Sequence, residues 1–336
     1  MLKTPSHMLH ESFGAWRVPC QQDDAARCAA WGAKVDRSFA ALRPQLAVLG
    51  NSSAMEGLSR LSEKEVYDLY LPTWSCEALE RVPQQPGDGP KWMCGLDALH
   101  SVSDCLVYSF GANGDSSFER AMKARNPHCQ IFTFDPSMPS RQNISGRCHT
   151  ARPEHCPYEP GWKLKATRDA AKQGIMTKFV EIGLAAHDGP IEIFPGMKQF
   201  PAMTLPSLMK MLGHENRTIN VLKIDIEGSE YTTLPHASIF GSCGKHGHRH
   251  RGTMPIPVEQ LQIELHGTNA VDVGKIFASV YSCGLQVFSV EPNRWGCDGY
   301  GCLEFSLVGP QQAMRSFLNT HPGVSEAWTQ SASRLN

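Results

Sequence analysis

The sequence predicts an α/β fold built on one open, mostly parallel β-sheet, and three observations support this prediction. From residue 105 onward, short apolar runs typical of strands alternate with segments typical of helices. Residues 105–134 have the pattern of a strand, a helix and a second strand, a unit that requires parallel strands and a right-handed crossover. Residues 285–290 and 302–308 are strand-like runs joined through Asn and Gly residues, which predicts an antiparallel pair at the end of the chain.

The first hundred residues lack strand-like runs and are expected to be helical or irregular. Residues 23–42 are rich in Ala with scattered charges, and they predict a helix that ends before Pro44. Ser62 and Glu65 have the spacing of a capping box and predict the start of a short helix. Residues 83–90 are rich in Gly and Pro and predict a loop.

The first strand of the sheet, Cys105–Phe110, runs into the glycine turn Gly111–Gly114. Ser116 and Glu119 form a second capping-box pattern, which predicts a helix before the strand at Gln130–Phe134. In chain order, the further elements expected are a strand over 178–185, a short ribbon over 190–194, a helix from an N-cap at Thr204 to Leu212 with Gly213 at its C-terminus, a strand that opens the segment 219–230, and a strand over 260–265.

Composition and charge describe a soluble globular protein of 336 residues with 41% hydrophobic and 19% charged residues. The net charge of −1 gives no electrostatic reason to expect nucleic acid or an anionic membrane as a partner. No apolar run approaches the roughly 18 residues of a transmembrane helix, and the N-terminus lacks the apolar core of a signal peptide. We expect an N-terminal extension over residues 1–100, a main domain over 101–320 and a tail over 321–336.

The cellular compartment stays open. The chain has twelve cysteines but no Cys-x-x-Cys pair, which counts against zinc ribbons and thioredoxin-like chemistry. Glycosylation sequons occur at Asn51, Asn143 and Asn216. Cysteines and sequons together suggest an oxidising lumen, where the cysteines around the last two strands and before the first could form disulfides, whereas the missing signal peptide argues against a lumen.

The segment Ile219–Glu230 is an apolar strand that ends in carboxylates, with Asp225, Glu227 and Glu230 around Gly228. Open α/β sheets bind ligands at the carboxyl ends of their strands, and a buried carboxylate there must be solvated, hydrogen-bonded or ligand-bound. This segment is therefore the first candidate for a site.

The order strand, glycine turn, capped helix, strand and acidic residue predicts a nucleoside-binding site. Asp135 follows Gly111 by 24 residues, close to the ~20 expected for a carboxylate that binds ribose hydroxyls. Both S-adenosylmethionine and a nicotinamide dinucleotide would use such a residue. The turn lacks a second glycine two places after Gly111, so it does not support a pyrophosphate. The residues therefore favour a methyltransferase, with an NAD-dependent oxidoreductase as the alternative.

Two segments closely resemble the core of the FkbM-type methyltransferases. Thr204-Leu-Pro-Ser-Leu208 and Leu222-Lys-Ile-Asp-Ile-Glu-Gly-Ser-Glu230 correspond to roughly Thr-Leu-Asp-x-Leu and Leu-Lys-Ile-Asp-Val-Glu-Gly-Ala-Glu in that family. The resemblance covers about residues 75–310 and extends to a eukaryotic branch, the methyltransferase-like proteins related to the human family member numbered twenty-four. This branch is similar in Asp88–Cys94, Cys105–Gly111, Phe134–Ser137 and Ile182–Leu184.

The resemblance implies a class I methyltransferase fold, a Rossmann-like seven-stranded sheet with its last strand antiparallel, that binds S-adenosylmethionine and methylates a hydroxyl of a small molecule or glycan. It places Asp225 near the sulfonium and the acceptor. By position, the family's cofactor-binding residues are Gly111, Ala112 and Asn113 at the methionine end, Asp135 at the ribose, and Leu184 and Ala185 beside the adenine.

The chain departs from the family at Ser109, where the first strand usually ends in an acidic residue that contacts the methionine amine. Asp115 or Glu119 could compensate. The departure supports a further alternative, a methyltransferase fold that has lost catalysis and acts as a binding module.

A hydroxyl acceptor also needs a base, and His266 is the candidate because it follows the fifth strand and has an ordinary pKa of about 6.5. Asp225 and Glu227 would share one face if the strand continued that far, and could then hold a divalent ion, although cofactor contact and turn support are favoured over a metal. Glu264 is expected to point away from His266.

Overall fold

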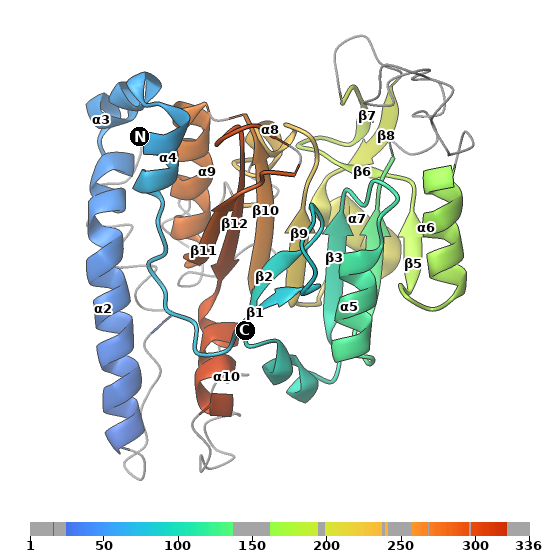
Figure 1. Cartoon of the computed structure of the whole chain (residues 1–336), viewed down its shortest axis with the longest axis horizontal. Helices are drawn as coiled ribbons and strands as arrows, with labels where there is room; N and C mark the ends of the chain where they lie inside the picture. The colour runs from blue at the N-terminus through green and yellow to red at the C-terminus, as the bar shows by residue number, and fades with distance from the viewer. Residues whose placement is uncertain are drawn as a thin grey trace.

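The computed structural model describes residues 16, 25–136, 162–193, 199–236, 239–240, 257–267, 269–295 and 297–320. At its centre is a seven-stranded sheet in the order β11-β12-β10-β9-β3-β4-β5 (Figure 1). β12 is antiparallel to both of its neighbours, and the other four pairs are parallel, which confirms the predicted fold class. The strands are β3 (Leu106–Phe110), β4 (Gln130–Phe134), β5 (Lys178–Val180), β9 (Val221–Ile224), β10 (Gln260–His266), β11 (Gln286–Pro292) and β12 (Cys302–Val308).

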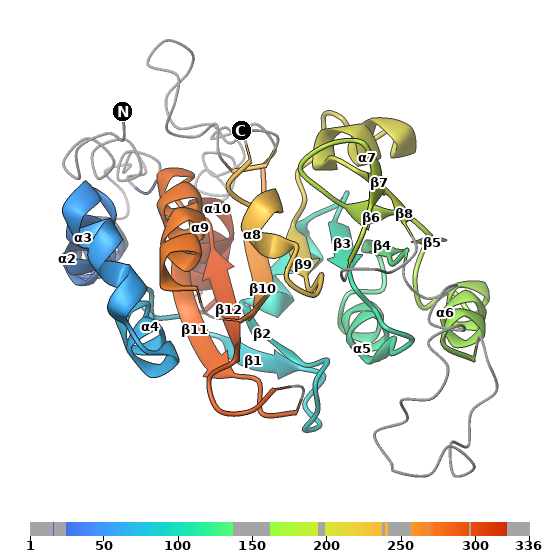
Figure 2. The ribbon, with the colours of Figure 1, turned by 90° about the horizontal axis from the view of Figure 1, so that it is seen from above.

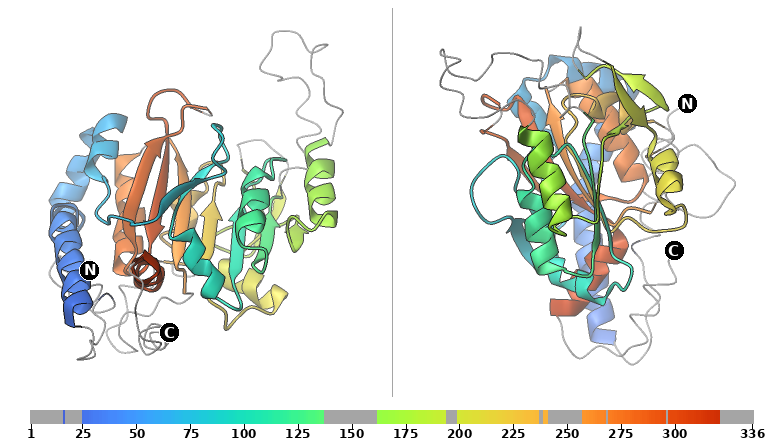
Figure 3. Two further views of the ribbon diagram at one scale, coloured as in Figure 1. Left: turned by 60° about the horizontal axis from the view of Figure 1, so that its bottom comes forward. Right: turned by 90° about the vertical axis from the view of Figure 1, so that its right-hand side faces the viewer.

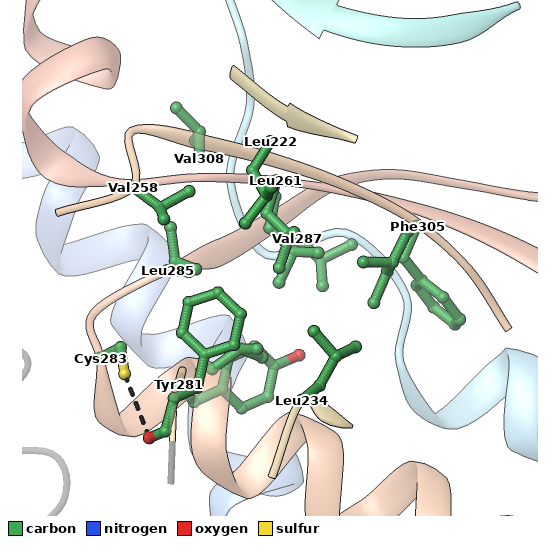
Figure 4. Packing of buried hydrophobic residues seen from close by; sticks show 14 of the residues in the cluster. Leu222, Leu234, Val258, Leu261, Tyr281, Cys283, Leu285, Val287, Phe305 and Val308 are labelled. Atoms are coloured by element: carbon green, nitrogen blue, oxygen red, sulfur yellow. Dashed lines mark hydrogen bonds between the residues drawn. The ribbon is translucent and has the colours of Figure 1, made fainter. Parts of the chain in front are cut away.

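Helices cover both faces of this sheet. Figures 2 and 3 show α5 (Ser117–Arg125) and α6 (Trp162–Lys172) on one face and α7 (Leu205–Leu212), α8 (Glu230–Thr233) and α9 (Ala270–Ser282) on the other. Every residue of β3 and β9 is buried, as expected for central parallel strands. In Figure 4, Leu261 of β10, Val287 of β11 and Phe305 of β12 pack with Leu285 and Tyr281 to form the core under α9.

Of the two helix caps predicted within the sheet region, the one at Thr204 is present and the one at Ser116 is not. Thr204 caps α7 by accepting a hydrogen bond from the Ser207 N–H, and Gly213 follows the helix with φ of 74°, as predicted. The capping box at Ser116 is wrong, because the Ser116 side chain makes no capping bond. Asp115 instead accepts from the Ser117 N–H at 2.8 Å, and Glu119 is buried against the sheet.

Before the first strand, the chain contains α2 (Ala25–Leu49), α3 (Ser52–Gly57), η2 (Leu58–Arg60) and α4 (Glu63–Leu69). The capping box of Ser62 and Glu65 is present at the start of α4. The predicted end of the first helix before Pro44 is wrong, because α2 continues through Pro44. Leu46 and Leu49 beyond the proline are buried in the same core as the sheet, and this packing outweighs the roughly 3 kcal/mol cost of an internal proline.

A hairpin that the sequence did not predict, β1 (Leu79–Val82) and β2 (Lys91–Cys94), lies on the face of the sheet that α5 covers. Its loop is the predicted Gly- and Pro-rich segment. The expectation of no strands before residue 100 was wrong. β2 packs against the main sheet through a charged residue, so its sequence lacks the apolar pattern typical of a buried strand. Lys91 Nζ lies 2.8 Å from Glu304 Oε1 and 3.3 Å from Glu264 Oε2, and all three side chains are almost entirely buried.

A second small sheet stands beside the main one, in the order β6-β8-β7. The strand expected over residues 178–185 is divided, because β5 joins the main sheet and β6 (Gly183–Leu184) joins the small one. β7 (Gly189–Ile191) overlaps the start of the ribbon expected over residues 190–194, and it pairs antiparallel with β8 (Phe200–Met203), a strand that the sequence did not predict. The remaining elements are η3 (Leu96–Ser101) and α10 (Pro310–Thr320), which pack together on the side of the hairpin.

The predicted tail, residues 321–336, and the sequon at Asn143 lie outside the described residues. Within the described ranges, no helix combines the length and the apolar character needed to cross a membrane.

All eight cysteines in the described ranges are disulfide-bonded. Three pairs join two described cysteines each, namely Cys76–Cys94, Cys105–Cys129 and Cys297–Cys302. The first and last pairs fall within the two sets of cysteines that the sequence marked as candidates. The middle pair joins the residue before β3 to the residue before β4.

We predict that the Cys105–Cys129 disulfide is present in the native protein and stabilises it. Replacing both cysteines by Ser should lower the free energy of unfolding by about 3 kcal/mol, because the bond closes a loop of 24 residues in the unfolded chain. Chemical denaturation measures the loss, and mass spectrometry of the unreduced protein detects the linked peptides. Alkylation of either cysteine in the folded protein without a reductant would contradict the prediction.

Candidate functional site

A cavity of about 390 Å³ lies at the carboxyl ends of β3, β4, β9 and β10. In a mostly parallel sheet these ends meet at one edge, which is where such folds bind ligands. Further parts of its wall come from the start of α5, the hairpin loop and the small sheet. Of the predicted site residues, Gly111, Ala112, Asn113, Asp135, Leu184, Asp225 and His266 line this cavity.

The glycine turn after β3 fits closely against the turn after β9. Gly111 has φ of 78°, and a Cβ at this position would lie 1.7 Å from the carbonyl oxygen of Asp225. Only glycine allows both the dihedral angle and this approach. Asn113 continues the turn with φ of 48°, and its N–H donates to Asp135 Oδ2 at 2.9 Å. The turn therefore couples the ends of three neighbouring strands.

Of the two neighbouring residues Leu184 and Ala185, one lines the cavity and the other does not. Leu184, on β6, lines the cavity, whereas Ala185 is buried without lining it, and its N–H donates to Met203 O. The pair predicted to flank an adenine is thus represented in the wall by Leu184, together with Ile191 and Ile193 of the neighbouring ribbon.

The turn after β9 places Asp225 and Glu227 differently. The strand ends at Ile224, so the condition under which both carboxylates would share one strand face is not met. Glu227 lies in the left-handed region with φ of 58°. The fully buried Glu230 holds this turn, because its two oxygens accept the N–H groups of Ile226 and Gly228, each at 2.8 Å.

Cations surround Asp225. Burial raises the pKa of its carboxyl, but Lys223, Lys91 and His266 outweigh burial and hold the pKa below its usual range. Lys223 Nζ lies 3.7 Å from Asp225 Oδ2 and donates to Gly111 O at 2.9 Å. Asp225 is therefore an ionised carboxylate at the cavity wall.

His266 stands at the end of β10 among three carboxylates. Its Nδ1 lies 3.2 Å from Glu230 Oε1, and because that carboxylate is an acceptor, Nδ1 donates. Its Nε2 lies 3.7 Å from Asp225 Oδ1. Burial lowers the pKa of His266, but the hydrogen bond and charge of Glu230, with Asp225 and Glu264, raise it to about 9. His266 is therefore protonated near neutral pH, and the ordinary pKa expected for it does not hold.

Glu264 faces His266, which corrects the expectation that it points away. The two residues are i and i+2 on β10, so they share one face, and Glu264 Oε1 lies 3.8 Å from His266 Nε2. The same carboxylate accepts from Asn293 Nδ2 at 2.6 Å and pairs with Lys91. Its pKa is raised by burial and by Asp225.

One group of acidic residues beside the site has the geometry of a metal site. Oxygen atoms of Asp88, Glu264 and Glu304 lie within 4.8 Å of one another. The Lys91 ammonium lies close to the carboxylates of both glutamates, and it donates to the main-chain carbonyl oxygen of Asp88 at 3.3 Å. A built-in cation thus provides the positive charge that a metal ion would bring.

The sequence did not identify Glu264, Lys223 and Lys91 as parts of this site, and it marked Glu230 as one of the carboxylates around Gly228 without giving it a role. Glu230 and Lys223 both lie in the candidate segment Ile219–Glu230, and their spacing around Asp225 was the available signal. Lys91 carried no signal, since nothing in the local pattern shows that a lysine is buried.

The sequence of the chain matches a known protein family. A family model described as a methyltransferase domain matches residues 52–308, which is most of the chain. The chain therefore belongs to this family. None of the curated proteins matches it.

We predict that Gly111→Ala destabilises the protein far more than Gly174→Ala. Both glycines have a φ near 75°, which costs an alanine about 1 kcal/mol, but Gly174 has open space where a Cβ would lie. The clash with Asp225 should add roughly 2 kcal/mol or more at Gly111. Chemical denaturation of both variants measures the difference. Equal losses of unfolding free energy would mean that the turn after β3 is not in close contact with the turn after β9.

We predict that His266 titrates near pH 9. Because the folded pKa lies above the unfolded value of 6.5, the stabilisation is complete below about pH 6.5 and is lost as the pH rises through 9. The shift corresponds to about 3 kcal/mol, which His266→Gln should remove. Histidine NMR titration measures the pKa, and denaturation against pH measures the stability. A ring that titrates near 6.5 would contradict the arrangement.

Proposed function

We propose that this member of the methyltransferase-domain family transfers the methyl group of S-adenosylmethionine to a hydroxyl of a small molecule or glycan. The closer relationship that we propose is to FkbM-type enzymes and to their eukaryotic branch related to the human member numbered twenty-four. The observation that carries the proposal is that one cavity brings together the glycine turn, Asp135 and the pair of Asp225 and His266.

The residues of the cavity fit the parts of this cofactor. Asp135 follows β4 beside the glycine turn and offers its carboxylate to the ribose hydroxyls. Leu184, Ile191 and Ile193 provide an apolar wall for the adenine ring. The glycine turn Gly111–Asn113 lets the methionine portion approach the backbone. Asp225 follows the next strand of the sheet, beyond this turn.

Methyl transfer needs an acceptor oxygen aligned with the methyl group, and a group that takes its proton. When bound, S-adenosylmethionine supplies a methyl group attached to its sulfonium sulfur, and the remaining thioether is a good leaving group. Because His266 is protonated, Asp225 is the residue that we propose accepts the hydroxyl proton. His266, oriented by Glu230, stabilises the carboxylate of Asp225 from 3.7 Å and positions it toward the acceptor.

We also propose that the chain folds in an oxidising compartment. The disulfides at all eight described cysteines support this, since such bonds are rare where thiols are kept reduced. The side chain of Asn51 is engaged at the start of α3, where it accepts from the Ala54 N–H. Of the sequons in the described ranges, Asn216 is the one whose side chain is not used in a helix cap.

We predict that the protein binds S-adenosylmethionine and that Asp135→Asn weakens this binding by roughly 10- to 100-fold, because hydrogen bonds to a charged group contribute about 1.5–3 kcal/mol. Asp225→Asn should reduce methyl transfer more than binding. Asp97→Asn, an exposed carboxylate in η3, should change neither. Calorimetry with the cofactor and with NAD measures binding, and labelled cofactor with fractionated extract measures transfer.

Three results would contradict the proposal. Absence of cofactor binding would leave only a non-catalytic module, and NAD binding abolished by Asp135→Asn would support an oxidoreductase. Wild-type affinity in the Asp135→Asn variant would show that the ribose assignment is wrong.

A further inference from the structure

Glu119 is a buried carboxylate at the cavity that the proposed reaction does not use. It lies in the first turn of α5, is 1% exposed and lines the cavity beside the glycine turn. Its sequence position predicted a capping box, but Asp115 has the capping role. Glu119 therefore does not have the capping role that its position in the helix predicts.

The sheet beneath Glu119 satisfies only part of its hydrogen-bonding capacity. Thr133, Ser109 and Lys223 lie side by side in register on β4, β3 and β9. Thr133 Oγ1 donates to Glu119 Oε1 at 3.4 Å. Within the described ranges, Glu119 Oε2 and the neighbouring Ser109 Oγ have no hydrogen-bond partner.

Lys223 does not supply the hydrogen-bond donor that Glu119 Oε2 lacks. Its ammonium donates to Gly111 O and lies 3.7 Å from Asp225 Oδ2, so it serves the turns above the sheet. Burial raises the pKa of Glu119, and the charge of Lys223 opposes this effect without cancelling it. A buried carboxylate oxygen without a partner is costly, unless a ligand supplies the missing donor.

The charges around the cavity favour a cationic ligand group at this position. Beside Glu119, the carboxylates of Asp115, Asp225 and Glu264 also line the cavity, whereas its cationic side chains are Lys223 and His266. Both of these cations are already engaged by protein oxygens. A ligand ammonium at Glu119 would both satisfy Oε2 and reduce the excess of negative charge.

We propose that Glu119 binds the α-ammonium group of the methionine portion of S-adenosylmethionine. This inference rests on the proposed function. The order of the strands supports it, because Asp135 on β4 is assigned the ribose, Asp225 on β9 the reacting end, and Glu119 lies against β3 and β4 between them. The carboxylate expected at Ser109 is thus delivered from the helix that covers Ser109.

The test compares three ligands that share the nucleoside. S-adenosylhomocysteine has the amine and the carboxylate, its decarboxylated form keeps only the amine, and 5′-methylthioadenosine has neither. Calorimetry with Glu119→Gln should show roughly 10- to 100-fold weaker binding of the two amine-bearing ligands and unchanged binding of 5′-methylthioadenosine. Glu215→Gln, an exposed carboxylate after α7, is the matched control and should bind all three ligands like wild type.

A second variant guards against an effect on folding. Glu119→Asp keeps the charge but withdraws it by one methylene, so it should weaken the amine-bearing ligands less than Glu119→Gln does. Binding of 5′-methylthioadenosine also reports that each variant is folded. Equal affinity of wild type and Glu119→Gln for S-adenosylhomocysteine overturns the assignment of Glu119 and leaves the cofactor proposal standing. Failure of all three ligands to bind wild type overturns both.

Discussion

The site depends on the close approach of the backbone at Gly111 to the carbonyl of Asp225, which only a glycine permits. Around this contact the ends of the central strands are tied together. The Gly111 N–H donates to Phe134 O, and the Asp225 N–H donates to Phe110 O. Lys223 then donates to Gly111 O from below. A shift of this turn would move Asp135, which the neighbouring Asn113 N–H holds, and Asp225 together.

Above this backbone frame, the site is a set of buried charges that balance one another. Compared with a well-packed apolar core, a complete buried ion pair adds little net stability, because the cost of desolvation offsets the attraction, whereas loss of one partner is strongly destabilising. Here the pairs also fix protonation states: Asp225 stays ionised beside Lys223, and His266 stays protonated beside Glu230. Lys91 extends the same balance to Glu264 and Glu304, and so joins the N-terminal hairpin to the wall of the cavity.

The sequence was sufficient where local chemistry decides the structure. Apolar periodicity located the strands, and Thr204 with Gly213 marked both ends of α7. It was insufficient where distant contacts decide. Pro44 stays in a helix because of packing that only the folded core provides. Lys91 defines a strand by pairing with residues more than 170 positions away. The pKa of His266 likewise depends on Glu230, which the turn after β9 brings beneath it.

The most direct measurement of the central claim is a crystal structure of the protein with S-adenosylhomocysteine. The account predicts the ribose hydroxyls within hydrogen-bond distance of Asp135, the adenine against Leu184, and the sulfur on the side of the cavity that Asp225 and His266 form. The ligand bound elsewhere, or bound here with its ribose away from Asp135, would contradict it.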